Sequence, residues 1–162
     1  MVKIKLIILD IDGVMTDGKV VVDHQGSESK RFCFKDFDAF SEIHDRGLKV
    51  GAITREISPI CNYLQKKVVW DFFYSGIKDK SAHLESICLE LGLSKEQICY
   101  VGDGKHDLEI MQKVGLPLCP NDAIDQVKKV AKEILSKKGG DGCVWEMISV
   151  IDRYNDEEVI GD

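Results

Sequence analysis

The chain of 162 residues has no excess of basic residues and no long apolar run. It carries 22 Lys and Arg against 28 Asp and Glu, a formal net charge of −6. Nonspecific binding to nucleic acid needs a basic footprint, so this class of function is disfavoured. No run approaches the ~20 apolar residues of a membrane span, and the N-terminal residues lack the pattern of a signal peptide. We therefore expect a cytoplasmic protein that binds neither nucleic acid nor membrane.

Cysteine pairs with the spacing of metal ligands are also absent. None of the six cysteines forms a C-x-x-C pair, which disfavours a zinc site. The even number permits disulfides, but several of the cysteines lie inside apolar runs. Buried reduced thiols therefore fit a chain of this size better. The six are Cys33, Cys61, Cys88, Cys99, Cys119 and Cys143.

The chain has neither an internal repeat nor a low-complexity linker, and its 44% hydrophobic residues are enough for one packed core. Short apolar runs alternate with segments of helical periodicity, which predicts a parallel sheet built from right-handed crossovers. We expect one α/β domain over residues 1–162, with a three-layer, doubly wound, mainly parallel sheet. Predicted strands lie at 6–9, 48–53, 71–74, 98–101 and 116–118. Predicted helices lie at 36–47, from 58 onward, and at 80–91, 108–114, 123–130 and 144–154, the first capped by Asp36.

The most informative stretch runs from Leu6 to Gly18, where an apolar run ends on Asp10 and Asp12. The carboxyl end of a parallel strand is where open α/β sheets bind ligands. Two carboxylates crowded there repel each other, and a divalent cation such as Mg²⁺ relieves that repulsion. For Asp10 to Gly13 alone, a strand that ends in an ordinary Asp/Gly turn is a plausible alternative.

Two other predicted strands also end on residues that can serve a phosphate or a metal. Thr54 follows the strand at 48–53, and Asp103 follows the strand at 98–101. In a doubly wound sheet such strand ends converge on one crevice. The convergence is a stronger indication of a site than any single motif, because threonines at strand ends are common.

Residues 10–18 have the pattern D-x-D-G-x-x-T-D-G, which resembles the first motif of the haloacid dehalogenase superfamily of phosphotransferases. The match through Asp17 and Gly18 narrows the resemblance to the family of 3-deoxy-D-manno-octulosonate 8-phosphate phosphatases. Members of this family act on ulosonic acid phosphates, and the family includes phosphatases of nine-carbon substrates. The resemblance implies a Mg²⁺-dependent hydrolase of phosphate monoesters that works through an aspartyl-phosphate intermediate. It also implies a place in ulosonic acid biosynthesis of the kind that supplies lipopolysaccharide.

The resemblance assigns roles to individual residues. Asp10 falls on the nucleophile, and Asp12 falls on the general acid/base, whose backbone carbonyl also ligates the metal in the family. Thr54, by hydroxyl and backbone N–H, and Lys80, by charge, would hold the phosphoryl group. The setting Gly76-Ile77-Lys78-Asp79-Lys80 favours Lys80 over Lys78; without the resemblance, two solvated lysines would be the preferred interpretation.

The segment Val101 to Asp107 resembles the fourth motif of the superfamily, often G-D-D-x-x-D. Asp103 would bind Mg²⁺ directly, and Asp107 would act through water or hold Lys80. The chain departs from the pattern at Gly104, which replaces a frequent second aspartate, and at His106. Asp10, the Asp12 carbonyl, Asp103, phosphate and water still suffice for an octahedron.

Two further segments bear on assembly. Residues 19–34 read as a β-hairpin inserted where larger members carry a cap domain. The sequence from Lys137 to Val144 resembles the C-terminal K-G-G-x-G-x-V signature of the family, which is also what a flexible glycine-rich loop looks like. The resemblance implies a homotetramer whose hairpins pair, with a lid or tail at about 137–162 that closes a neighbour's site.

The sugar is less well defined than the family. The octulosonate phosphatases carry Thr-Gly-Arg after the second strand, whereas here Thr54 is followed by Arg55 and Glu56. A glutamate at this place resembles phosphatases of nine-carbon, sialic-acid-like 9-phosphates. Arg55, Glu56 and Lys67 are the candidate substrate contacts, with Arg55 as a possible clamp for the sugar carboxylate.

Three functions follow as alternatives. The first is a phosphatase of a 3-deoxy-2-ulosonic acid phosphate, of either the eight-carbon or the nine-carbon type. The second is a catalytically silent tetramerisation domain of the kind associated with nonulosonate cytidylyltransferases. The third is a general phosphatase without sugar preference. The presence of Asp10, Asp12, Lys80, Asp103 and Asp107 together favours an active enzyme over the silent domain.

Overall fold

A computed structural model of the chain describes residues 2–157 and contains a six-stranded parallel sheet. The strand order is β5-β4-β1-β6-β7-β8, so the first strand of the chain lies near the centre. The strands are β1 (Leu6–Leu9), β4 (Lys49–Ile53), β5 (Phe72–Tyr74), β6 (Ile98–Val101), β7 (Leu116–Cys119) and β8 (Glu133–Ile134). The predicted doubly wound α/β class is confirmed.

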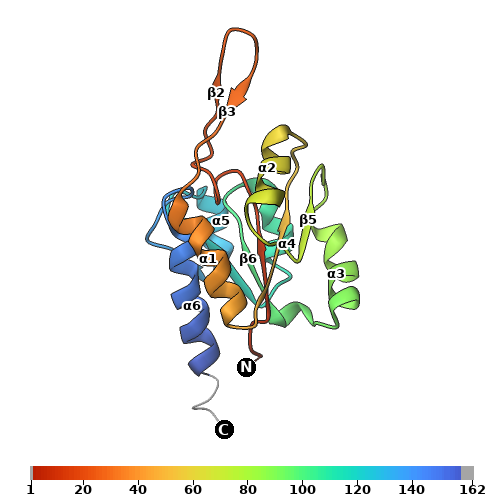
Figure 1. Cartoon of the computed structure of the whole chain (residues 1–162). Helices are drawn as coiled ribbons and strands as arrows, with labels where there is room; N and C mark the ends of the chain where they lie inside the picture. The colour runs from red at the N-terminus through yellow and green to blue at the C-terminus, as the bar shows by residue number, and fades with distance from the viewer. Residues whose placement is uncertain (1, 158–162) are drawn as a thin grey trace.

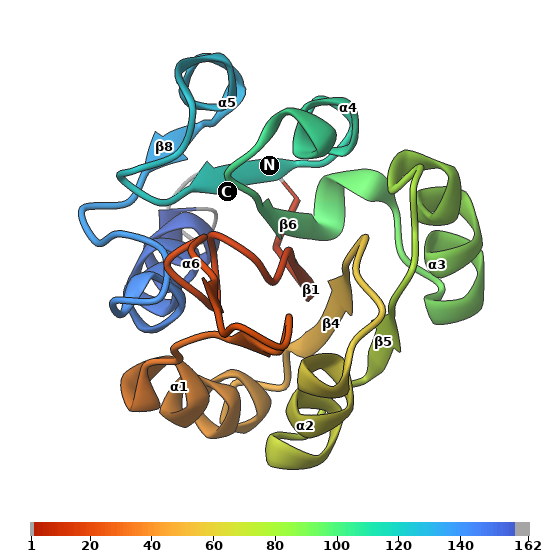
Figure 2. The same ribbon diagram turned by 90° about the horizontal axis from the view of Figure 1, so that it is seen from above.

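Helices cover both faces of the sheet, which makes three layers (Figures 1 and 2). One face packs against α1 (Phe34–Asp45), α2 (Pro59–Lys67) and α6 (Cys143–Glu157). The other packs against α3 (Leu84–Leu91), α4 (Leu108–Met111) and α5 (Asp125–Val130). Three 3-10 turns precede or join these elements: η1 (Ser81–His83), η2 (Lys95–Gln97) and η3 (Lys105–Asp107).

Strand β1 is buried on both sides, as its continuous apolar run predicts. Ile7 and Leu9 point into the core beneath α1, α2 and α6, whereas Leu6 and Ile8 point into the core beneath α3, α4 and α5. Successive residues of a strand face opposite sides of the sheet, so both faces must be apolar. Leu9 is aligned with Ala52 of β4 and with Val101 of β6. This register brings the residues after β1, β4 and β6 to one edge.

Local sequence signals fix several helix boundaries. Ser58 caps α2 by accepting a hydrogen bond from the Cys61 N–H, with Pro59 in the first turn. Gly92 ends α3 in the left-handed conformation. Ser94 and Gln97 form a capping box at η2. Strand β8 was not predicted, because its two residues pair with β7 without an apolar run to mark them.

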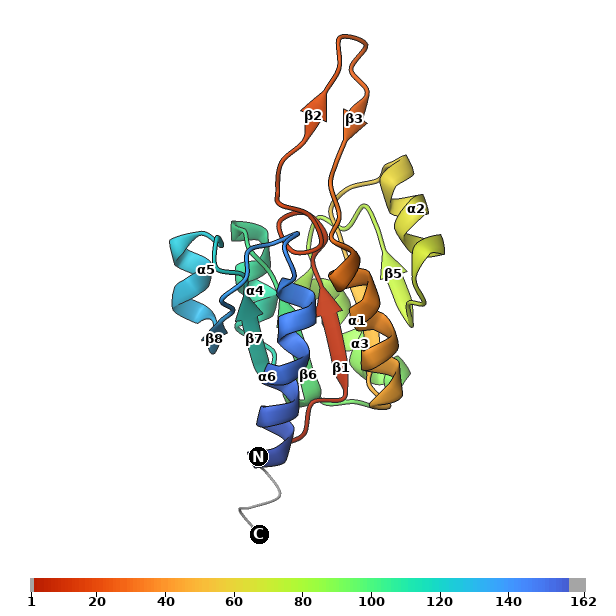
Figure 3. The same ribbon diagram turned by 60° about the vertical axis from the view of Figure 1, so that its left-hand side comes forward.

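The segment after β1 forms the predicted hairpin, which projects from the sheet (Figures 1 and 3). Only β2 (Val21–Val22) and β3 (Glu28–Ser29) pair, which is shorter than the predicted 19–34. The turn closes through Asp23, whose carboxylate accepts from the N–H groups of Gln25 and Ser27.

The interpretation of Asp36 as the cap of its own helix is wrong. Helix α1 begins at Phe34, and the carboxylate of Asp36 reaches α6 instead (Figure 3 shows the two helices side by side). It accepts hydrogen bonds from the N–H groups of Gly142, Val144 and Trp145 at 3.2, 3.0 and 3.2 Å. Burial raises the pKa of Asp36 despite these donors. The residue therefore ties the first helix to the last.

None of the helices described in residues 2–157 is long and apolar enough to cross a membrane. Helix α6 ends at Glu157, so the predicted lid or tail at 137–162 is helical from Cys143 to Glu157. The remainder of that tail and of the predicted lid, residues 158–162, lies outside the described residues.

Replacing Asp36 with Ala should destabilise the protein by about 1–3 kcal/mol, because three backbone donors at the start of α6 lose their acceptor. Urea unfolding followed by circular dichroism measures this difference. Asp36→Asn, which keeps one acceptor oxygen, should cost less. Asp38→Ala alters an exposed aspartate of the same helix and should change little. Equal stability of Asp36→Ala and Asp38→Ala would contradict this role.

Candidate active site

Asp10 lies directly after β1, and its carboxylate is nearly buried, with 12% of the side chain exposed. Its backbone N–H donates to the Val101 carbonyl, which extends the sheet by one bond and fixes the residue at the edge. Asp10 Oδ1 lies 2.8 Å from Lys80 Nζ and also accepts from the Ile11 N–H. The structure thus brings together the predicted nucleophile and the predicted cation.

Asp103, which follows β6, lies against the loop that carries Asp10. A Cβ placed on Gly13 would come within 1.8 Å of Asp103 Oδ2, and Gly13 has a φ of +87°. Both conditions require glycine at this position. Carboxylate oxygens of Asp10, Asp103 and Asp107 all lie within 4.8 Å of one another.

Asp107 is almost wholly buried, and hydrogen bonds occupy both of its oxygens. Oδ1 accepts from Lys80 Nζ at 2.8 Å and from the Tyr100 hydroxyl at 2.6 Å. Oδ2 accepts from the N–H groups of Asp103 and Gly104, both at 3.0 Å. This arrangement matches the predicted role of holding Lys80. Sequence analysis missed Tyr100. Its hydroxyl in an otherwise apolar, buried strand does indicate a polar partner nearby.

The crowded carboxylates shift one another's proton affinity. Burial, and then the charge of Asp107, raises the pKa of Asp10 well above its usual value, against the opposing effect of Lys80. Burial and Asp107 likewise raise the pKa of Asp103 to about 6. Despite its burial, Asp107 has a lowered pKa because Lys80, Tyr100 and backbone donors stabilise its charge. The ammonium of Lys80 thus leaves part of the negative charge uncompensated.

These oxygens fit a hard divalent cation. Asp10 and Asp103 each have a carboxylate oxygen within 4.8 Å of the other, and both can still accept further bonds. The oxygens of Asp107 lie equally close, but hydrogen bonds already occupy them. Within residues 2–157 no hydrogen-bond donor reaches the carbonyl oxygen of Asp12, which leaves it free to act as a ligand. Oxygen ligands of this kind suit Mg²⁺, which keeps several waters in addition to a few carboxylates.

The loop from Asp12 to Gly18 is organised by the buried hydroxyl of Thr16. It accepts from the N–H groups of Gly13 and Gly18 at 3.2 and 3.1 Å, and it lies 3.4 Å from Asp12 Oδ1. The threonine of the motif therefore shapes the turn that carries Asp12. Asp12 itself is 34% exposed at the side chain, so a substrate can reach it.

Lys30, from the base of the hairpin, also binds Asp12 and was missed by the sequence analysis. Its Nζ lies 2.8 and 3.0 Å from the two carboxylate oxygens of Asp12 and 2.5 Å from Glu56 Oε2. The carboxylates of Asp12 and Glu56 raise the pKa of Lys30 although its burial acts in the opposite direction. No local pattern marks this lysine, because its partners lie in two other loops.

Thr54 is buried where β4 ends, but its backbone does not face the crevice as expected. Its N–H donates to the Tyr74 carbonyl at 2.8 Å, so the prediction that this N–H binds phosphate is wrong. The register with β5 requires this bond. The hydroxyl accepts weakly from the Glu56 N–H at 3.3 Å, so the predicted contact of this hydroxyl with phosphate stays a prediction.

Arg55 and Lys67, the other candidate substrate contacts, are both exposed. Slight desolvation, and then the charge of Arg55, lowers the pKa of His106. The ammonium of Lys67 lies 5.7 and 5.5 Å from the ring centres of Phe34 and Phe37. Thr54, Arg55 and Glu56 thus follow β4 at the edge of the sheet that carries Asp10. Lys67 is the last residue of α2, and its ammonium lies over the two rings of α1 instead.

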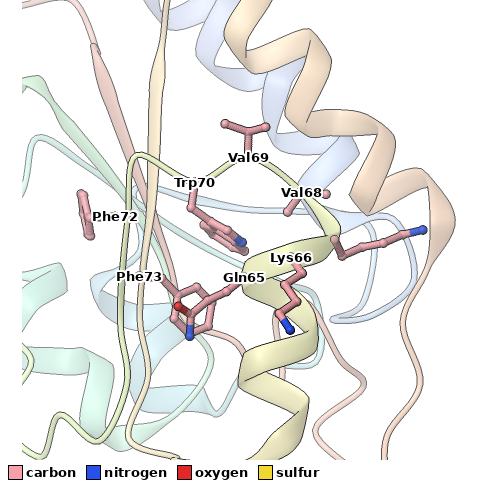
Figure 4. A pocket seen from close by; sticks show the side chains of 8 residues that line it. Gln65, Lys66, Val68, Val69, Trp70, Phe72 and Phe73 are labelled. Atoms are coloured by element: carbon pink, nitrogen blue, oxygen red, sulfur yellow. The ribbon is translucent and has the colours of Figure 1, made fainter.

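A hollow of about 490 Å³ lies beside the end of α2 and is lined by residues 65–70, Phe72 and Phe73 (Figure 4). Its floor contains Trp70 and Phe73, whose rings meet edge to face with centres 5.1 Å apart. Of the candidate residues only Lys67 lines it, and no carboxylate does. Because phosphate chemistry needs the groups around Asp10, this hollow is not the candidate site.

The glycine-rich loop before α6 packs against the first loop of the same chain. The Gly140 N–H donates to the Val14 carbonyl at 2.9 Å, and a Cβ on Gly139 would lie 1.8 Å from the Gly13 carbonyl oxygen. Beside this contact is a second hollow of about 440 Å³, lined by the loop and by charged residues that include Asp17 and Arg31. The predicted lid segment therefore lies next to the candidate site.

Comparison with known proteins supplies the family. A family model described as haloacid dehalogenase-like hydrolase matches residues 51–148. The chain belongs to this family. Among curated relatives of the hydrolase, the 3-deoxy-D-manno-octulosonate 8-phosphate phosphatase KdsC of Haemophilus influenzae is 30% identical over 148 residues, which cover 91% of this chain and 82% of the relative. The resemblance drawn from the motifs is confirmed.

Solved structures agree with this assignment of the hydrolase. The 3-deoxy-D-manno-octulosonate 8-phosphate phosphatase of Yersinia pestis matches with a TM-score of 0.88 and 29% identity, over 94% of this chain and 83% of the other. The enzyme of the same name from Moraxella catarrhalis, solved with magnesium, phosphate and KDO, matches with a TM-score of 0.87 and 26% identity, over 97% and 92%.

Replacing Asp103 with Asn tests the crowding of carboxylates in the metal-free hydrolase. The pKa of Asp103 in the folded state, about 6, lies above its unfolded value, so this carboxyl stabilises the fold below the unfolded pKa and loses that contribution as pH rises through about 6. Asp103→Asn should therefore raise the melting temperature above about pH 7 and give a smaller gain below about pH 4.5, measured with EDTA present.

Adding Mg²⁺ should stabilise the wild type more than Asp103→Asn, since a ligand that binds only the folded state raises its stability. Asp38→Asn, in an exposed part of α1, should leave both responses unchanged. A loss of stability in Asp103→Asn that is the same at both pH values would contradict the pKa argument.

Proposed function

We propose that this hydrolase is a Mg²⁺-dependent phosphatase that acts on a 3-deoxy-2-ulosonic acid phosphate of the octulosonate 8-phosphate type. The observation that carries the proposal is the grouping of Asp10, Asp103 and Asp107 around Lys80 at the carboxyl end of the sheet. The curated relatives and the magnesium, phosphate and KDO complex of the Moraxella enzyme support the same reaction.

The first step forms a bond between a carboxylate oxygen of Asp10 and phosphorus as the ester P–O bond breaks. Asp12 gives its proton to the departing sugar oxygen. Lys80 and the Thr54 hydroxyl would hold the non-bridging phosphate oxygens. When bound by Asp10, Asp103 and the Asp12 carbonyl, Mg²⁺ supplies positive charge that favours attack on an anionic phosphate.

The second step returns the enzyme to its starting state. Asp12, now a carboxylate, takes a proton from water, whose oxygen attacks the phosphorus of the aspartyl phosphate. Asp10 leaves as a carboxylate, and inorganic phosphate is released. Asp107 takes no part in bond making in this scheme, because its four hydrogen bonds commit it to holding Lys80 and the loop after β6.

The substrate contacts belong to the proposal too. Arg55 would pair with the sugar carboxylate, Glu56 would accept from hydroxyl groups, and Lys67 would contribute only after its ammonium leaves the rings of α1. The relatives do not favour the nine-carbon substrate or the silent assembly domain, although Glu56 occupies the place that suggested the former. We place the enzyme in the cytoplasm, as its free thiols suggest.

The proposed assembly is a homotetramer that pairs the hairpins. Val20, Val21 and Val22 are 46%, 71% and 55% exposed, which is unusual for three consecutive apolar residues. The hairpin projects beyond the sheet, so it can reach another copy (Figure 3). Such pairing would cover its valines and place a neighbour beside the crevice of each site.

A panel of ulosonic acid 8- and 9-phosphates with simple sugar phosphates tests the reaction by phosphate release. We expect Mg²⁺-dependent turnover, fastest on the eight-carbon acid and abolished by EDTA. Asp10→Asn should lower kcat by roughly 10³-fold or more, because the nucleophile is lost, whereas Asp45→Asn should not. Equal rates across the panel would indicate a general phosphatase, and no turnover by an assembled wild type would indicate the silent domain.

Light scattering after gel filtration tests the assembly. Val21→Lys should lower the molar mass from four copies to fewer, because a charge on the paired hairpins must be desolvated. Leu89→Lys changes an even more exposed apolar residue, on α3, and should leave the mass unchanged. A wild type that elutes as a single copy would refute the tetramer.

A further inference from the structure

Lys30 is the least expected cation near the site. It follows β3 at the base of the hairpin, and only 5% of its side chain is exposed. Lysine is almost never so buried unless it is paired. Here it binds two carboxylates at once, Asp12 from the loop after β1 and Glu56 from the loop after β4. The ammonium thus joins three segments that are distant in sequence.

The contact with Asp12 involves both carboxylate oxygens, at 2.8 and 3.0 Å from Nζ. Such a contact restricts rotation of the carboxylate about its bond to Cβ, which a single hydrogen bond does not. The weak bond from Thr16, at 3.4 Å, is the other hydrogen bond to the carboxylate of Asp12 among residues 2–157. Lys30 is therefore the main determinant of the orientation of Asp12.

We propose that Lys30 is a positioning residue that aims Asp12 at the leaving oxygen, an inference that rests on the function proposed above. In the first step the proton of Asp12 passes to the ester oxygen as the P–O bond breaks and the bond from Asp10 to phosphorus forms. The carboxylate left on Asp12 then meets an ammonium already in place. Lys30 thereby makes the hairpin part of the proton-transfer apparatus.

The contact with Glu56 links the same lysine to substrate recognition. Glu56 is half exposed at the side chain, with 44% accessible, whereas Lys30 is not. A sugar hydroxyl can therefore reach Glu56 but cannot reach Lys30 directly. Lys30 thus acts on the reaction through its two partners, which separates it from residues that touch the phosphate.

A double-mutant cycle with the ulosonic acid phosphate tests this role in the presence of Mg²⁺. Lys30→Met should lower kcat/KM by about 10- to 100-fold, the cost of misplacing a catalytic group. In the Asp12→Asn background the same change should have little further effect, because residues that act as a unit are not additive. Lys30→Arg should recover part of the loss. Lys35→Met, at an exposed position, is the matched control.

The leaving group supplies the second measurement. 4-Nitrophenyl phosphate releases a stable anion that needs no proton, and kcat/KM reports only steps through the first irreversible one. Lys30→Met should therefore lower kcat/KM for the sugar phosphate at least about 10-fold more than for the aryl ester. A structural role would lower both equally and would also lower the melting temperature.

The outcomes separate the inference from the function it rests on. A wild type without Mg²⁺-dependent turnover refutes the proposed function itself. With an active wild type, the positioning role is refuted by unchanged kcat/KM in Lys30→Met, by additive losses in the double variant, or by equal losses on the sugar and aryl substrates.

Discussion

The site depends on the repulsion among buried carboxylates at one edge of the sheet. Asp10, Asp103 and Asp107 approach within 4.8 Å, and burial raises the pKa of two of them. The fold tolerates this because Lys80 lies 2.8 Å from both Asp10 and Asp107. One ammonium does not neutralise three carboxylates, and the remaining charge is what attracts a divalent cation.

The neighbouring aspartates are assigned to different tasks by their hydrogen bonds. Both oxygens of Asp107 accept two hydrogen bonds each, so it has little acceptor capacity left for a metal or a substrate. Asp12 is more exposed, with 34% of its side chain accessible, and it is held by the buried ammonium of Lys30, so in the proposed reaction it can both reach a substrate and keep its orientation. Asp10 is nearly as buried as Asp107, but its carboxylate can still accept further bonds. Identical side chains thus differ in function because their partners differ.

Much of this could be predicted from the sequence, and the exceptions have a common cause. The strands at 6–9 and 98–101 are apolar runs that end on aspartates, so both the sheet and the positions of Asp10 and Asp103 followed from local pattern. The partners of Lys30, Tyr100 and Asp36 lie in other elements. Neither periodicity nor motif spacing reports such contacts, which is why Asp36 was assigned to the wrong helix. The two-residue β8 lacked a pattern altogether.

The packing of Gly139 and Gly140 onto the loop after β1 has a consequence for how the protein is made. The ribosome releases the loop of the proposed nucleophile first and its packing partner about 120 residues later, since residues 13–17 meet residues 139–140. Asp36 likewise waits for the N-terminus of α6. At the usual rate of synthesis this delay lasts roughly 6–25 s. A nascent chain truncated before residue 139 would carry every proposed catalytic side chain, but its loop after β1 would lack the glycines that pack on it.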